Sequence, residues 1–337
     1  MSRPVLLVAA ALLAASAIVS AKPVPREKPL PAITAANAHQ VVKLQELPQD
    51  IWRIVFGPKN GQVVFLGWEK SADVLDATTF APIGKIGADK RLIHVACDSQ
   101  GDRVAYCENS TTVEILNLKD NTTTSIQTGS QQPGMAFSPS GKLLATGGSG
   151  TQAKLWDVAT GKLVRTFDVG PVVGGLTVQF SPDGKRLAVG HRNSTTGIFE
   201  VESGKRQHTL DRKMSQGLRF SPDGKTLAIA YVDGSLALWN VADGTLRHER
   251  KSSAQELYGV SWSAGGDVLA TAGRQGRITL WRAADLSVLK EFDAPEWVIQ
   301  VHFTPDGTRL LTSGGSMLPS PSRKVTVWGL ESPRAER

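Results

Sequence analysis

The sequence predicts an all-β fold built from seven similar units, and two spacings carry this prediction. A first apolar marker ends a short alternating segment and returns every 40 to 43 residues. A second apolar marker follows it after 19 residues in six units and after 25 in the last. The first markers are Phe56, Cys97, Phe137, Phe180, Phe220, Trp262 and Phe303, and the second are Leu75, Leu116, Trp156, Phe199, Trp239, Trp281 and Trp328. Self-similarity at this period predicts a seven-bladed β-propeller with four antiparallel strands per blade.

Residues 1–21 are typical of a secretory signal peptide. Arg3 supplies a positive start, Val5–Val19 is almost wholly apolar, and Ala21 is the small residue that a signal peptidase prefers. An uncleaved membrane anchor is the alternative, although the apolar stretch is short for a membrane span. We therefore expect cleavage near Ala21, a periplasmic or extracellular location, and no transmembrane segment in the mature chain.

Residues 22–39 predict a semi-rigid, solvated linker because Pro23, Pro25, Pro29 and Pro31 crowd into it. The propeller is expected over 40–330, followed by a short tail at 331–337.

Each unit is expected to hold four short strands, as the fourth shows. Thr177–Phe180 alternates as a strand, and Ser181–Gly184 is a turn in which Pro182 presets φ and Gly184 accepts a positive φ. Leu187–Val189 and Ile198–Val201 are the next two strands. Variants of the same turn follow most of the other first markers.

The two ends of the chain are expected to close the ring. Gln40–Leu47 alternates like a fourth strand but precedes the first unit, whereas only nine residues follow Trp328. We therefore predict that Gln40–Leu47 pairs beside the strand that ends at Trp328, so that main-chain hydrogen bonds remove the open edges.

The aromatic markers are interpreted as packing residues between neighbouring blades, since both faces of each sheet must be buried. Three tryptophans, Trp52, Trp68 and Trp297, lie off the markers and stay open to other roles. The two cysteines, Cys97 and Cys107, are predicted to be unpaired thiols, because adjacent strands would place them roughly 10 Å apart, beyond disulfide reach. A disulfide remains the alternative in an exported protein.

Several segments resemble the WD-repeat family of β-propellers. The run Phe-Ser-Pro-Asp-Gly-Lys at 180–185 and 220–225 is typical of it, and so is Leu155-Trp156-Asp157-Val158. The resemblance covers about 290 residues and departs from the family pattern in two ways, because only Trp156 is followed by Asp and no Gly-His pair precedes a blade. Exported bacterial members of the family look similarly relaxed, so the resemblance implies a bacterial envelope protein that acts as a scaffold without enzymatic activity.

Motifs that carry chemistry are absent from the sequence. No two of the six His stand at a metal-ligand spacing, no Ser lies in a nucleophile elbow, and no helix follows Gly147–Gly150 to form a phosphate loop. The net charge of +7 comes from dispersed Lys and Arg, which does not favour nucleic-acid binding. We predict no enzyme, no cofactor and no metal.

Candidate partner-binding residues follow from the resemblance, because family partners usually dock on the face that bears the loops from fourth to first and from second to third strands. Aromatic and Arg residues are the usual hot spots of interfaces. On this face the sequence places Trp52, Trp68, Arg91, Arg192, Tyr258, Arg274 and Trp297. Their alternative role is to cap the blade ends.

The predicted function is that of an exported, monomeric scaffold that binds a protein or peptide partner in the cell envelope. Two alternatives stay open, a propeller enzyme of the lactonase or hydrolase type and a binder of cell-wall polysaccharide.

Overall fold

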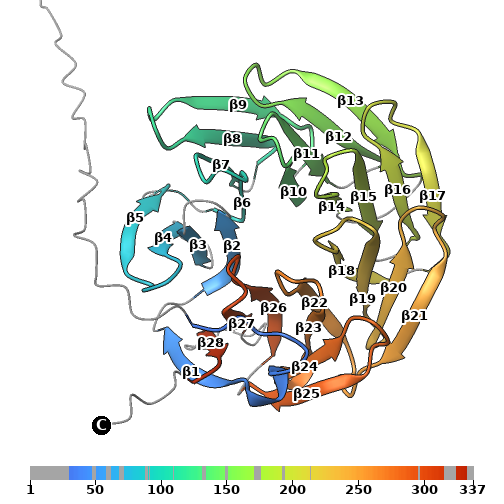
Figure 1. The fold of residues 1–337 in the computed structure, drawn as a ribbon. Coiled ribbons are helices and arrows are strands. Elements are labelled where there is room, and N and C mark those ends of the chain that lie inside the picture. Colours follow the sequence, from blue (N-terminus) through green and yellow to red (C-terminus); the bar gives the residue numbers. More distant parts are fainter. Residues whose placement is uncertain are drawn as a thin grey trace, which may run out of the picture.

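Seven four-stranded antiparallel sheets stand in a ring in the computed structural model (Figure 1). The structure describes residues 30–47, 51–57, 62–67, 72–87, 90, 92–108, 110–130, 134–148, 151–170, 176–191, 194–212, 214–294, 297–314 and 324–331. Within these residues the ring confirms the predicted all-β, seven-bladed propeller. Only two short 3-10 helices interrupt the described part of the chain, η1 (Ala38–Gln40) and η2 (Arg274–Gly276).

In blades one to six the strands run in chain order from the innermost to the outermost (Figure 1). Blades one to three are β2 (Ile51–Gly57), β3 (Gln62–Gly67), β4 (Ala72–Asp76), β5 (Pro82–Ile86); β6 (His94–Cys97), β7 (Arg103–Cys107), β8 (Thr112–Asn117), β9 (Thr123–Gln127); and β10 (Gly134–Phe137), β11 (Leu143–Gly147), β12 (Gln152–Asp157), β13 (Leu163–Asp168). Blades four to six are β14 (Leu176–Phe180), β15 (Arg186–His191), β16 (Thr196–Glu200), β17 (Arg206–Leu210); β18 (Ser215–Phe220), β19 (Thr226–Tyr231), β20 (Ser235–Asn240), β21 (Leu246–Lys251); and β22 (Leu257–Trp262), β23 (Val268–Gly273), β24 (Arg277–Arg282), β25 (Val288–Asp293). Blade seven is β26 (Val298–Phe303), β27 (Arg309–Gly314), β28 (Val325–Gly329) and, from the other end of the chain, β1 (Val42–Leu47).

The ring closes through β1, as predicted. Strand β1 pairs antiparallel with β28, and its register runs from Val42 opposite Gly329 to Leu47 opposite Val325. This pairing gives blade seven its outer strand. The edges of β1 and β28 that face each other are both hydrogen-bonded, so neither is left open.

Closure also uses residues that the sequence assigned to a solvated linker. The Ile33 N–H donates to the carbonyl oxygen of Gly307 at 2.8 Å, and the Ala35 N–H donates to Asp267 Oδ2 at 2.7 Å. The Ile33 and Ala38 side chains are buried in the core of blades six and seven. The segment 30–39 therefore packs against the ring and is not a solvated linker. The last proline of the predicted linker is Pro31, and the buried apolar side chains begin two residues later, at Ile33. The other residues of the predicted linker and the predicted signal peptide lie outside the described part.

The core lies between neighbouring blades, where the marker side chains are buried. Trp281 is only 1% exposed and packs with apolar residues of blade five. Its indole N–H donates to Thr271 Oγ1 on the neighbouring strand at 2.9 Å, and Trp156 and Trp328 donate in the same way to Thr146 and Thr312. Each buried indole thus has a partner for its polar atom, as a low-dielectric core requires.

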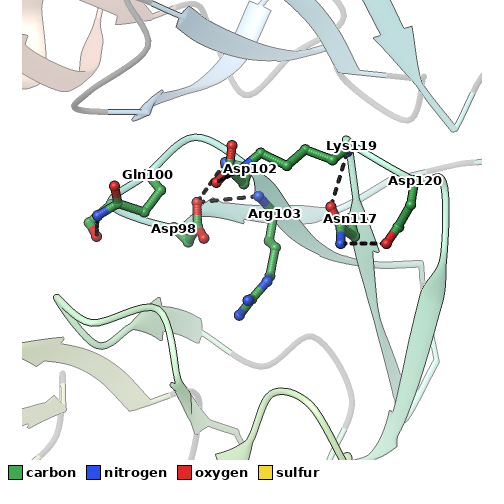
Figure 2. A network of polar contacts seen from close by, with 8 residues as sticks. Asp98, Gln100, Asp102, Arg103, Asn117, Lys119 and Asp120 are labelled. Carbon is green, nitrogen blue, oxygen red and sulfur yellow. Dashed lines mark hydrogen bonds and ion pairs between the residues drawn. The ribbon is translucent and has the colours of Figure 1, made fainter.

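The turns between first and second strands, which we call the rim turns, repeat one hydrogen bond. The hydroxyl oxygen of the first turn residue accepts a hydrogen bond of 2.9 to 3.1 Å from the backbone N–H of the residue five positions later. The accepting residues are Ser138, Ser181, Ser221, Ser263 and Thr304. In blade two Asp98 takes this place: its Oδ1 accepts the N–H groups of Asp102 and Arg103 (Figure 2). Blade two lacks the Ser or Thr of these turns and thus keeps the bond with another residue.

The two cysteines are free thiols, as predicted. Cys107 lies opposite His94 in the β6–β7 pair, while Cys97 lies opposite Val104, so the two side chains are three residues out of register. Burial raises the pKa of Cys97 to about 12 and that of Cys107 to about 11. Neither thiol is poised as a nucleophile at neutral pH.

No helix within the described residues combines the length and the apolar character needed to cross a membrane.

Candidate functional site

A cavity of about 880 Å³ runs between the first strands of the blades. Its wall includes residues of β2, β6, β10, β14, β18, β22 and β26, so every blade contributes. We call this cavity the central channel. Its volume lies in the range of small-molecule sites, and its lining is part apolar and part polar.

Two positions of the repeat face the central channel, one and three residues before each first marker. Several blades carry small or apolar residues there, and three have glycine at the earlier position: Gly134, Gly217 and Gly259. A Cβ on Gly217 would lie 2.9 Å from the carbonyl oxygen of Tyr258, so glycine allows blades five and six to approach closely. At the earlier position the polar side chains are therefore confined to the other blades.

At the earlier position, polar side chains cluster on blades seven, one and two. Arg53 Nη1 lies 2.7 Å from His94 Nδ1, and Gln300 Oε1 accepts the Ile54 N–H at 2.7 Å. Since a guanidinium can only donate, His94 Nδ1 is the acceptor and the ring proton sits on Nε2. Burial, followed by the Arg53 charge, holds the pKa of His94 well below its ordinary value. Burial also lowers the pKa of Arg53 to about 10, which leaves it charged at neutral pH.

At the later position, polar side chains lie on blades four to seven. Arg219 and His302 both line the central channel, and His302 meets the Phe56 ring edge-on at 6.2 Å. Burial, followed by the charges of Arg219 and Arg53, lowers the pKa of His302 to about 3. Gln179 Oε1 accepts the Phe220 N–H at 3.3 Å. Both imidazoles on the channel wall are therefore neutral at pH 7.

A cluster of aromatic and charged residues lies where blades six and seven meet, and we call it the mouth cluster. The Arg274 guanidinium carbon is 4.9 Å from the centre of the Trp297 ring, and Tyr258 packs against the same ring at 6.5 Å. Glu256 joins them, because it accepts from Tyr258 Oη at 2.6 Å and from Arg274 Nη1 at 2.9 Å. Tyr258 also lines the central channel. The mouth cluster therefore borders the opening of the channel.

Among the residues that the structure describes, the same combination of a cation over an aromatic ring with a nearby carboxylate occurs twice more. Arg212, between β17 and β18, lies 4.1 Å from the Tyr231 ring centre and pairs with Asp233 at 2.6 Å. Lys90, between β5 and β6, lies 5.3 Å from the Tyr106 ring centre and pairs with Glu108 at 3.3 Å. Each cation leads into a first strand, so these two groups lie on the same face as the mouth cluster.

Three of the seven residues that the sequence proposed for partner binding come together in the mouth cluster: Tyr258, Arg274 and Trp297. All three are partly exposed. Trp52 belongs to β2, but its side chain is outside the described residues, as are Trp68, Arg91 and Arg192. Their role in binding stays a prediction.

Sequence reasoning missed Glu256 and the polar residues of the channel wall. The spacing of the six histidines does not join any two of them, although the structure places His94 and His302 on one cavity with Arg53 and Arg219. The available signal was positional: each lies one or three residues before a first marker. Only the assembled ring shows that these two positions share a channel.

No group of three or more His, Cys, Asp or Glu side chains that could hold a metal ion occurs among the described residues. The arrangement can offer aromatic surface, hydrogen-bond donors and positive charge.

Two family models match the chain. The WD domain, G-beta repeat, matches residues 124–157, and the WD40 domain of anaphase-promoting complex subunit 4 matches residues 211–264. The first match runs from the outer strand of blade two, β9, through β10, β11 and β12 of blade three, and the second covers blade five and the start of blade six. No curated protein matches the chain significantly.

Proposed function

We propose that this chain, which belongs to the WD-repeat β-propeller family, is an exported scaffold without enzymatic activity that binds a protein or peptide partner in the cell envelope. WD-repeat domains commonly mediate protein interactions. The site we assign to the partner is the mouth cluster.

The observation that carries the proposal is the convergence of Tyr258, Trp297 and Arg274 on one face. Aromatic rings and arginine are the residue types that contribute most to protein interfaces. Glu256 holds two of them by hydrogen bonds of 2.6 and 2.9 Å, so their geometry is set before a partner arrives. A pre-ordered cluster loses less side-chain entropy on binding than free surface residues do.

Site-specific crosslinking in intact cells tests the partner site. A photoreactive amino acid replaces Trp297 in one variant and Val288, a half-exposed residue of the outer strand β25, in the control. We expect a crosslinked species at 297 that is missing at 288 and that weakens when Arg274→Ala is added. Equal crosslinking at both positions contradicts the proposal, since the mouth cluster would then have no preference.

Export is tested separately. We expect the protein in the periplasmic or extracellular fraction, with a mass that places its N-terminus near residue 22. Full-length protein in the cytoplasmic fraction contradicts this part of the proposal and leaves the partner site untouched.

A further inference from the structure

The wall of the central channel carries positive charge that no described carboxylate balances. Arg53 in β2 and Arg219 in β18 line the channel from opposite sides of the ring (Figure 1). Among the described residues that line it there is no Asp or Glu. The arginines on the channel-mouth face behave differently, since Arg212 and Arg274 both pair with carboxylates within 3 Å.

The hydrogen-bonding capacity of these two guanidinium groups is incompletely used. Arg53 Nη1 bonds to His94, but the buried Arg53 Nε has no hydrogen-bond partner. Arg219 Nη1 donates to the carbonyl oxygen of Leu218, its own neighbour in the chain, at 3.1 Å. A buried donor without a partner costs free energy, and a buried charge costs more. Buried donors and charges of this kind are expected at functional sites, where a bound ligand supplies the missing hydrogen-bond acceptor and the opposite charge.

The neighbouring polar side chains also present donors. The oxygens of Gln300 and Gln179 accept backbone N–H groups of the next blade, so the amide nitrogens are what these two side chains have left to offer. The proton of neutral His94 sits on Nε2, as argued above. A group that enters the channel therefore meets donors and positive charge from several blades.

From this geometry we infer that the central channel is an oxyanion site, which takes a carboxylate or a phosphate group between Arg53 and Arg219. The fork of N–H donors on arginine matches both groups, and each bond between ionised partners is stronger than a neutral one. The oxyanion has two possible sources, an acidic side chain or C-terminus of a bound peptide, and a free small anion. The inference does not depend on the mouth cluster binding a partner.

The electrostatics of His302 agree with this placement. Both arginines lower the pKa of that one imidazole, so their fields overlap in the channel. An anion between the two guanidinium groups would interact with both. Because these groups are half-buried, the interaction is screened less than it would be at the surface.

Calorimetric titration of the full chain with inorganic phosphate, at constant ionic strength in a chloride buffer, tests the site. We expect saturable binding at one site per chain. Arg53→Gln and Arg219→Gln should each weaken it about 10- to 100-fold, because each removes a charged hydrogen-bond donor. Arg282→Gln is the matched control: it removes the same charge from an exposed residue at the end of β24 and should leave the affinity unchanged.

A second titration separates the two sources of the oxyanion. Hexaglutamate is compared with hexaglutamine on the same four proteins. Phosphate binding supports a free anion, and binding of hexaglutamate alone, with the same loss in the two channel variants, supports an acidic peptide segment. The site is overturned if neither probe binds the wild-type chain, or if Arg53→Gln and Arg219→Gln respond as Arg282→Gln does.

Thermal melting in chloride separates a binding role of the arginines from a structural one. Without an anion the two charges oppose burial, so Arg53→Gln should melt at the wild-type temperature or above it. The phosphate-induced rise of the melting temperature should be lost in this variant. A variant that melts far below the wild type in chloride counts against the site, because Arg53 would then support the fold by itself. Retained crosslinking at Trp297 in that case would leave the proposed partner site standing.

Discussion

The rim turns and the wall of the central channel both consist of one position repeated around the ring, but they treat charge in opposite ways. At the rim, Asp98 substitutes for a hydroxyl residue and gives its oxygen to two backbone N–H groups (Figure 2). In the channel, Arg53 and Arg219 replace small or apolar residues and have no described carboxylate beside them. At the rim the residue type changes but the hydrogen bond to the backbone is kept, so the architecture of the turn is preserved. In the channel the change of residue type leaves a charge and hydrogen-bond donors without partners, and such a position is available to bind a ligand.

Removal of the closing segment should have the largest effect, because it breaks the ring on which both regions depend. A chain that begins at residue 49 lacks β1 and the buried side chains of Ile33 and Ala38. We expect it to show no cooperative thermal transition, whereas a chain that begins at residue 30 keeps these contacts and should melt like the full chain. Equal melting of the two truncated chains would show that β1 does not hold the ring.

Loss of a marker ring should rank second. Trp281→Ala removes a side chain that is 1% exposed and leaves Thr271 Oγ1 without its indole partner. We expect the free energy of unfolding to fall by about 3–5 kcal/mol. The matched control is Thr271→Val, which keeps the ring but leaves the indole N–H unpaired and should cost about 1–3 kcal/mol. Denaturant unfolding measures both, and a loss in Trp281→Ala no larger than in the control would contradict the packing role.

The channel histidines should make stability depend on pH in a window that the rim carboxylates do not share. Burial and the arginines lower the pKa of His302 to about 3, and the pKa of His94 is lowered as well. The unfolded chain therefore takes up protons near the ordinary histidine pKa, whereas the folded chain does not. Stability is fully present above pH 6.5 and is lost as the pH falls toward 3.

The protonation of His302 should lower the free energy of unfolding by about 2 kcal/mol between pH 6.5 and 4.5, when solvent screening in the channel is allowed for, and His94 should act in the same direction. Carboxylates with a lowered pKa, such as Asp183 and Asp223 at the rim, lose their contribution only below about pH 4. Unfolding by denaturant at several pH values checks this, with His94→Gln/His302→Gln as the comparison. A double variant with the same slope as the wild type over this window would contradict the assignment.

The sequence predicts the fold well because the features that build it are repeated. The markers, the rim turns and the unmatched strand at 40–47 all follow from spacing, and β1 pairs with β28 as the spacing requires. The buried role of Ile33 could not be predicted, because a proline-rich segment hides where packing begins. The place of Asp98 directly after the first marker Cys97 also follows from spacing, but its role as the acceptor of the repeated bond does not, since its neighbours do not match the Ser-Pro-Asp-Gly turn.

The candidate site is less predictable for a physical reason. Tyr258, Trp297 and Arg274 could be assigned to one face from their places before first strands and after second strands. Glu256, which joins two of them, sits in a stretch with no repeat signal. Function on this ring depends on residues that differ between blades, and a single sequence shows such differences only as departures from the repeat. In addition, the residues that face one another across the channel, such as Arg53 and Arg219, come from blades far apart in the chain, so sequence spacing does not bring them together.

The smallest effect is expected at Asp98, where the comparison can be made sharpest. Asp98→Ala removes a side chain that is only 2% exposed and leaves the N–H groups of Asp102 and Arg103 without their side-chain acceptor, so we expect the free energy of unfolding to fall by about 1–2 kcal/mol. Asp98→Ser restores the hydroxyl used by Ser181 and its counterparts, so it should cost no more than about 0.5 kcal/mol. Denaturant unfolding of both variants measures the difference. If the serine variant is as unstable as the alanine variant, the carboxylate of Asp98 has a role beyond the repeated hydrogen bond. The rim turn of blade two would then depend on a charge, as the channel wall does, and would differ from the other rim turns.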